Sequence, residues 1–278
     1  MASVLLTPAN GTVSSATGEA LSARGVGFRA GVRNPVSYEG GGNPVAFDFE
    51  KPETWGRAFD GIESLFLVRP PTVEIDRIRE AAAAASRCGV ESVVYLSVLG
   101  ADRNPLLPHR RIERHLEGLP VATTFLRASF FMQNVDEVHA RWIHKRDEVF
   151  VPAGGGETSF VDARDVGTVA ATCVSEPDHE GRAYDLTGPE ALDYYEVAAI
   201  LSAELDRPIS YAAPSPWVFA RHELAAGTPL ALVLVMLGIY TTARLGLAGR
   251  VTDDVERVLG RPPRSFEEYA ADYREAFE

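Results

Sequence analysis

The chain has 278 residues, of which 46% are hydrophobic and 24% charged, as is typical of a globular protein with a real core. This length allows one large domain, or one domain with a smaller appended lobe. The formal net charge is −12, from 27 basic and 39 acidic residues. Proteins that bind nucleic acid usually present a concentrated basic face, so this balance argues against nucleic acid as a partner.

The two cysteines, Cys88 and Cys173, lie far apart in predicted helices, without the spacing of metal ligands. We expect two buried free thiols in a protein of the reducing cytoplasm, and no metal site. The first residues form an apolar strand and do not resemble a signal peptide. The longest apolar run, residues 230–239, is shorter than the roughly 20 residues of a membrane span. We expect no membrane partner, and we expect this run to be a buried helix or a hydrophobic lid over a pocket.

The first 130 residues alternate apolar runs with amphipathic stretches. The predicted strands cover residues 3–6, 27–32, 45–49, 64–68, 92–97 and 121–127, and the predicted helices cover 13–24, 52–59, 73–88 and 108–117. Such alternation indicates parallel strands joined by crossover helices, and strands that are apolar throughout fit a sheet covered on both faces. The sequence therefore predicts a Rossmann-type α/β fold with a doubly wound parallel sheet, and a ligand site at the carboxyl ends of the strands.

After about residue 150 the pattern changes. Strands are predicted at 159–161, 183–186 and 209–212, and helices at 166–175, 194–205 and 265–278. Asp165 is expected to cap the helix that follows it. We therefore divide the chain into a dinucleotide-binding-type Rossmann domain, residues 1–150, and a smaller C-terminal α/β lobe, residues 151–278, interleaved with the first and covering its site.

The loop between the first strand and the first helix reads T-P-A-N-G-T-V-S over residues 7–14. In short-chain dehydrogenases it reads T-G-x-x-G-x-x-G, and the glycines let a pyrophosphate approach the helix N-terminus. Gly11 matches the middle glycine, whereas Pro8 and Ser14 replace the other two, and proline fixes φ and removes a donor. Three readings stay open: a dinucleotide bound in a modified pose, weak or absent binding with the fold kept for another ligand, or an ordinary turn. The candidate cofactor contacts on this loop are Asn10, Gly11, Thr12 and Val13.

Two arginines follow the second and fourth strands. An acidic residue after the second strand binds the adenosine ribose, whereas an arginine accommodates a 2′-phosphate. Arg33 therefore favours NADP(H) over NAD(H) if either binds; otherwise it is a solvated loop charge. Arg69 follows the fourth strand, where the turn passes beside the cofactor ribose and nicotinamide. We expect it to contact the cofactor, to bind an anionic substrate, or to face solvent.

Several segments in order resemble one family over nearly the whole chain: residues 32–35 (VRNP), 95–101 (YLSVLGA), 124–127 (TFLR), 129–134 (SFFMQN), 160–167 (FVDARDVG), 181–189 (GRAYDLTGP), 251–254 (VTDD) and 260–263 (GRPP). The chain resembles the NmrA-like branch of the atypical short-chain dehydrogenases, which includes NADPH:quinone oxidoreductases and NADP-sensing regulators. The resemblance implies an NADPH-dependent reductase of a planar carbonyl or quinone. We expect a small aromatic substrate, and a monomer or homodimer.

The positions of the standard catalytic tyrosine and lysine are held by Pro105 and His109. His109 is a candidate catalytic acid because imidazole titrates near neutral pH; its alternative is a capping or packing role. Glu113 lies one turn later and either orients His109 or is a solvated charge. Ser97 stands at the family's catalytic serine and either binds a substrate carbonyl or caps its own backbone.

In the relatives, the segment after the sixth strand lines the pocket near the nicotinamide. Phe130, Phe131 and Asn134 are therefore candidate substrate contacts, and their aromatic rings suit a flat ligand, although one of the two is expected in the core. A later group is expected to form a lid of which one or two members contact a ligand: Trp217, Phe219, His222, Met236 and Tyr240.

Two other functions stay open. One is a non-redox enzyme of aromatic natural-product biosynthesis that has lost cofactor use, motivated by the departures at Pro8, Ser14, Arg69 and Pro105. The other is an NADP-sensing regulator that acts through a protein partner.

Overall fold

A computed structural model describes residues 3–137 and 139–278. The chain forms two compact units that are interleaved in sequence. The first contains residues 3–128, Ala163–Leu186 and Asp254–Arg261, and the second contains Ser129–Asp162, Thr187–Asp253 and Pro262–Glu278. The units thus differ from the predicted division at residue 150, because two later segments fold with the first unit.

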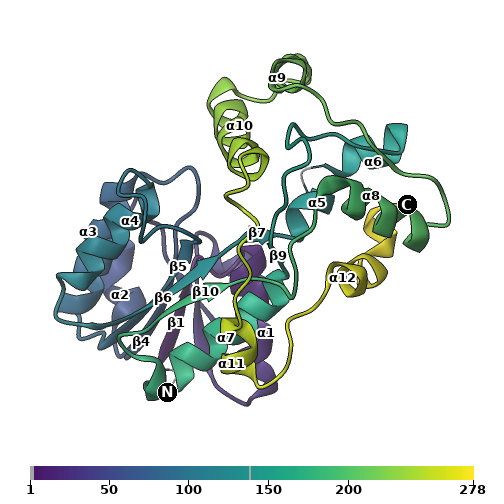
Figure 1. Ribbon diagram of the computed structural model, residues 1–278. Helices are drawn as coiled ribbons and strands as arrows, with labels where there is room; N and C mark the ends of the chain where they lie inside the picture. Colours follow the sequence, from purple (N-terminus) through teal and green to yellow (C-terminus); the bar gives the residue numbers. More distant parts are fainter. Residues whose placement is uncertain (1–2, 138) are drawn as a thin grey trace. The chain divides into compact units, whose positions relative to one another are not determined.

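A parallel sheet forms the centre of the first unit (Figure 1). Its order is β10-β6-β5-β4-β1-β2-β3, and every pairing within it is parallel. The strands are β1 (Val4–Thr7), β2 (Phe28–Val32), β3 (Asn43–Ala46), β4 (Ser64–Val68), β5 (Ser92–Val98), β6 (Ala122–Ala128) and β10 (Ala183–Leu186). This arrangement confirms the predicted Rossmann-type α/β fold.

Helices cover both faces of this sheet (Figure 1). One face carries α2 (Trp55–Phe59), α3 (Ile75–Arg87) and α4 (Pro108–Glu117); the other carries α1 (Thr12–Ala23) and α7 (Ala163–Ser175), with α11 (Asp254–Leu259) packed on α7. Short 3₁₀ turns lie at Pro35–Ser37, Pro52–Thr54 and Pro177–His179. A Cβ on Gly167 would lie 2.6 Å from the Cβ of Ala16, so this glycine permits the close contact of α7 with α1.

Two predictions about α7 and the cysteines need correction. Asp165 is not a cap, because the helix already begins at Ala163; its carboxylate accepts a hydrogen bond from Arg261 Nη2 at 2.6 Å. Both cysteines are free, and Cys173 is buried as predicted, but Cys88 is exposed. Cys88 is the residue directly after the last turn of α3, on the solvent side of that helix end.

The second unit has two short sheets and an aromatic core. β7 (Phe130–Phe131) pairs with β9 (Phe160–Val161), and β8 (Glu148–Val149) pairs with β11 (Ser210–Tyr211). Its helices are α5 (Gln133–Glu137), α6 (Ala140–Arg146), α8 (Tyr194–Glu204), α9 (Pro216–Ala225), α10 (Leu230–Arg244) and α12 (Phe266–Asp272), followed by a 3₁₀ turn at Arg274–Ala276. Asp193 and Ser265 start α8 and α12 with capping boxes.

Helix α10 contains the long apolar run. Its buried residues are Val233, Met236, Tyr240 and Ala243, whereas the side chains of Leu230, Leu232, Leu234, Val235 and Ile239 are 43–59% exposed. The prediction of a buried helix is therefore wrong for most of its surface. Within the described part of the chain, no helix has both the length and the apolar character of a membrane span.

Candidate functional site

The loop before α1 is open where a phosphate would approach. Gly11 is the N-cap of α1 with a φ of −90°, no side chain caps the helix, and its first turn holds no acidic residue. A Cβ at residue 11 would have no heavy atom within 4 Å, and Asn10, Gly11 and Thr12 are exposed. Pro8 follows Thr7 through a cis peptide bond, and the loop is anchored by Ala9 N, which donates to Gly31 O at 2.9 Å. The geometry therefore fits a pyrophosphate at the helix N-terminus.

The next two residues point inward. Val13 and Ser14 are buried, so Val13 can offer a ligand its backbone but not its side chain. Ser14 replaces the third glycine, and its hydroxyl has no hydrogen-bond partner among the described residues. A serine therefore fits in the buried side of the first turn of α1.

A cavity of about 690 Å³ opens at the carboxyl ends of β2 and β3. It is lined by Asn10, Val32, Arg33, Asn34, Ser37, Tyr38, Glu39, Asp48 and Lys51. No carboxylate of the described residues forms an ion pair with its two cations, Arg33 and Lys51. Asp48 is engaged locally, since its Oδ1 accepts from Glu50 N at 3.0 Å. Lys51 was not predicted, although it follows β3 at the carboxyl edge of the sheet, where this fold binds its ligands.

A tyrosine–histidine pair lies at the end of β5. Tyr95 Oη and His109 Nδ1 are 2.8 Å apart, and Tyr95 is fully buried. Burial raises the pKa of Tyr95 far above its ordinary value. Burial, and next the positive charge of Arg69, lower the pKa of His109 to about 4. The imidazole is therefore neutral at pH 7. Tyr95 was missed because β5 was interpreted as a purely apolar strand, although a buried tyrosine hydroxyl needs a partner.

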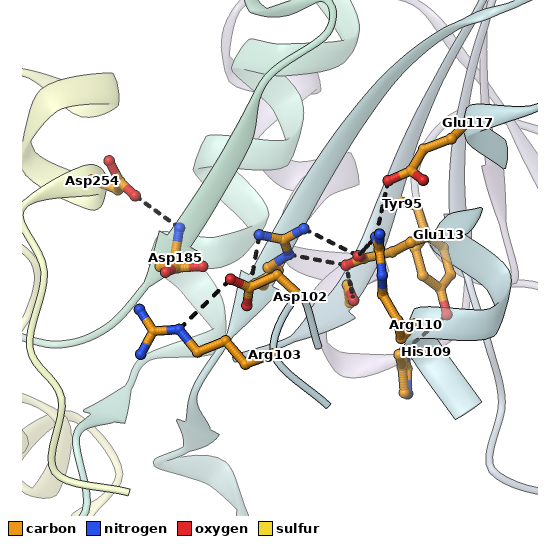
Figure 2. Close-up of polar contacts among 11 residues, drawn as sticks. Tyr95, Asp102, Arg103, His109, Arg110, Glu113, Glu117, Asp185 and Asp254 are labelled. Carbon is orange, nitrogen blue, oxygen red and sulfur yellow. Dashed lines mark hydrogen bonds and ion pairs between the residues drawn. The ribbon is translucent and has the colours of Figure 1, made fainter. Parts of the chain in front are cut away.

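Glu113 lies on α4, the helix that also carries His109, and is the centre of a buried hydrogen-bond network (Figure 2). Its carboxylate accepts from Ser97 Oγ at 2.7 Å, from Arg127 Nε and Nη2 at 3.0 Å each, and from Arg110 Nη1 at 2.9 Å. Burial raises the pKa of Glu113, but hydrogen bonds from Arg127, Ser97 and Arg110 outweigh it, so the pKa lies below its usual value. The prediction that Glu113 orients His109 or is solvated is wrong. Ser97, 2% exposed, gives its hydroxyl to Glu113 and not to its own backbone.

Arg69 lies directly after β4. It is half-buried, and Nη2 donates a long 3.5 Å hydrogen bond to Pro71 O. Its Nε is buried without a hydrogen-bond partner among the described residues. Arg69 follows β4, whose Leu67 pairs with Tyr95 of β5, and Tyr95 contacts His109, so the three residues share one edge of the sheet. The charge of Arg69 opposes the rise in the pKa of Tyr95 and adds to the fall in the pKa of His109.

The predicted substrate residues Phe130, Phe131 and Asn134 belong to the second unit, and all are half-buried. Phe130 packs edge-on to Phe160, with 5.7 Å between ring centroids. Of the predicted lid residues, Phe219, Met236 and Tyr240 are buried in the core of the second unit, His222 packs against Trp142 and Phe150, and Trp217 is 82% exposed.

Comparison with known proteins gives consistent matches over nearly the full chain. The model of the NmrA-like family matches residues 2–270. The NAD(P)H azoreductase of Xenophilus azovorans is 32% identical over 283 residues, which cover 99% of each protein. An NADPH-dependent quinone oxidoreductase of Escherichia coli, solved with NADPH, superposes with a TM-score of 0.89 at 24% identity, covering 98% of this chain and 99% of the other. The triphenylmethane reductase of Citrobacter sp., solved with NADP(H), superposes with a TM-score of 0.83 at 23% identity, covering 96% of this chain and 98% of the other. At these identities the two structures support the fold alone.

Proposed function

Because the chain belongs to the NmrA-like family, we propose that it is an NADPH-dependent reductase of a small planar aromatic substrate, such as a quinone or an azo compound. The observation that carries the proposal is the cavity where Arg33 and Lys51 lie beside Asn10 of the open loop. Arg33, directly after β2, and Lys51, after β3, form no ion pair with a carboxylate of the described residues and so suit a 2′-phosphate. The similarity to an NAD(P)H azoreductase over 99% of both chains supports the same activity.

In this proposal, the residues that hold NADPH come from one edge of the sheet. Backbone N–H groups of residues 10–13 face the pyrophosphate, and the exposed Gly11 leaves room for it. Arg33 and Lys51 bind the 2′-phosphate. Arg33 is exposed at the mouth of the cavity, so it is free to form a bidentate contact.

When bound, NADPH supplies a hydride. Reduction of a quinone to a hydroquinone consumes that hydride, which carries two electrons, and one further proton. We assign this proton to Nε2 of His109, with the Tyr95 hydroxyl donating to Nδ1 and so fixing the tautomer. Solvent then restores the imidazole proton. A quinone depends less on a strong protein acid than a ketone does, because hydride transfer leaves a stable phenolate-type anion that can be protonated afterwards, whereas a ketone gives a strongly basic alkoxide.

The remaining predicted residues are proposed to position other groups or to contact the substrate. Ser97 is a positioning residue, because its hydroxyl is buried on Glu113 and so links β5 to α4. Phe130, Phe131 and Asn134, which belong to the second unit, stay predicted contacts of an aromatic ligand. We further propose that the protein works in the cytoplasm, as its two free thiols suggest, and as a monomer or homodimer.

The Arg33→Ala variant tests the cofactor site. Loss of one charge-assisted contact to the 2′-phosphate should raise the KM for NADPH by roughly tenfold to hundredfold and leave that for NADH nearly unchanged. The matched control is Arg24→Ala, which removes an arginine at the far end of α1 that pairs with Glu176 at 3.3 Å. Equal changes for NADPH and NADH in Arg33→Ala, or the same loss in the control, would contradict the assignment.

A further inference from the structure

Arg69 occupies an unusual position for a cation. It follows β4, one residue beyond the pairing of Val68 with Leu96, and thus lies at the carboxyl edge of the sheet beside the end of β5. Pro70 and Pro71 come next, and their fixed φ angles restrict the turn that presents Arg69. The guanidinium therefore starts from a stiff segment at the edge where this fold binds its ligands.

Two N–H donors of this guanidinium lack a good hydrogen-bond acceptor. Nε is buried and has no partner among the described residues, and Nη2 reaches Pro71 O at 3.5 Å, the outer limit of a hydrogen bond. A buried donor left without an acceptor destabilises the folded protein. A ligand oxygen that reached Nε would remove this destabilisation.

No protein carboxylate neutralises Arg69 in the described part of the chain. Its neighbours in the same unit, Arg110 and Arg127, both form ion pairs with Glu113. Both carboxylate oxygens of Glu113 already accept two hydrogen bonds each, from these arginines and Ser97, so Glu113 does not pair with Arg69. Arg29 is likewise half-buried without an acidic partner in the described part of the chain, but it donates to three backbone carbonyls, whereas Arg69 has only the long bond to Pro71 O.

We infer that Arg69 forms an anion subsite that binds a carboxylate or sulfonate on the aromatic substrate, so that the enzyme prefers anionic acceptors to neutral ones. The planar fork of an arginine binds such oxygens in a bidentate manner. The inference rests on the proposed function and narrows its substrate class. Arg69 follows β4, whose Leu67 pairs with Tyr95 of β5, and Tyr95 Oη is 2.8 Å from His109 Nδ1, so an anion bound to Arg69 has its aromatic ring at the same edge of the sheet as the proposed proton donor.

A matched pair of acceptors tests the subsite: anthraquinone-2-sulfonate and the neutral anthraquinone-2-sulfonamide. With saturating NADPH, the wild-type KM should be lower for the sulfonate. Arg69→Gln should raise the KM of the sulfonate by roughly tenfold to hundredfold, and change the KM values of the sulfonamide and of NADPH by less than about threefold. The control variant is Arg79→Gln, which loses an exposed pair with Asp76 on α3 and should behave as wild type.

Two outcomes would overturn the inference. Equal changes for both acceptors would make Arg69 a general structural residue, and a rise in the KM of NADPH alone would make it a cofactor contact. If the wild type reduces neither acceptor, the proposed function fails. Calorimetric titration with anthraquinone-2-sulfonate then tests separately whether Arg69 binds an anion. Binding that Arg69→Gln abolishes would then still support the subsite, and absence of binding to the wild type would refute it.

Discussion

Replacing Glu113 by glutamine should destabilise the first unit strongly. The carboxylate is fully buried and accepts four hydrogen bonds from three side chains, two of them arginines that are 12% and 18% exposed. After the change, Arg110 Nη1 keeps its ion pair with Glu117 Oε1 at 2.9 Å. The remaining ion pair of Arg127 is with Asp102, whose Oδ1 is 3.9 Å from Nη1. The variant therefore leaves one mostly buried guanidinium without a close anion.

The size of the effect follows from this geometry. Removing one member of a buried ion pair costs about 3–5 kcal/mol, and the glutamine carbonyl still accepts part of the network, so we expect about 3 kcal/mol. At about 2–4 °C for each kcal/mol, the melting temperature should fall by roughly 6–12 °C. Because the pKa of Glu113 is lowered in the folded protein, its contribution is fully present above its unfolded value and is lost as pH falls through the folded value.

Scanning calorimetry of Glu113→Gln and Glu117→Gln measures the difference. Both glutamates lie on α4 and both accept a hydrogen bond from Arg110 at 2.9 Å, but Glu117 is 42% exposed, so its variant should lose no more than about 1 kcal/mol. If the two variants melt within about 2 °C of each other at pH 7, the reasoning from burial and charge pairing is refuted.

Two further predictions concern the loop and the second unit. Gly11→Ala should weaken NADPH binding by roughly tenfold or more in a fluorescence titration but cost less than about 1 kcal/mol of stability, because φ is −90° and no atom lies within 4 Å of the new Cβ; unchanged binding would contradict it. Burial lowers the pKa of His139 from 6.5 to about 4, so the unfolded chain binds the extra proton and stability should fall by about 3 kcal/mol as pH falls from 6.5 to 4. Urea unfolding at several pH values should show a slope that contains this share. Because the pKa of His109 is lowered to about 4 as well, His139→Gln should remove the His139 share and leave the rest, and an equal slope in the variant would exclude His139 as a source.

The sheet of the first unit was largely predictable from local pattern. Residues 64–68, 108–117 and 183–186 form β4, α4 and β10 with the predicted bounds, because apolar runs between turn residues determine them locally. The assignment of β10 to the first sheet was not predictable in this way. Tyr184 pairs with Leu126, far away in sequence, and no local pattern carries that information.

The candidate site was predictable in part. Arg33 was expected at the end of β2 from the Rossmann rule, and it lines the cavity there. Glu113 was misjudged as solvated or as a partner of His109, although its neighbours Ile112 and Leu116 mark the buried face of α4. Which donors reach a buried carboxylate depends on strands that are distant in sequence, as Arg127 of β6 shows.

Because Pro8 and Ser14 replace two glycines of the dinucleotide-binding loop, the sequence allowed the interpretation that the protein no longer binds a dinucleotide. No heavy atom of the described residues lies within 4 Å of a Cβ built at Gly11, and Asn10 and Thr12 are exposed, so the loop is open at Gly11. Ser14 is buried in the first turn of α1, whereas Gly11 is exposed. These observations favour retained cofactor use over a non-redox function.

Calorimetric titration of the wild-type protein with NADPH, beside NADH, tests the central claim most directly. We predict saturable binding of one NADPH per chain, tighter than that of NADH by roughly tenfold or more, because the cavity with Arg33 and Lys51 provides for the 2′-phosphate. Absence of saturable binding at millimolar NADPH, or equal affinity for the two nucleotides, would contradict the account.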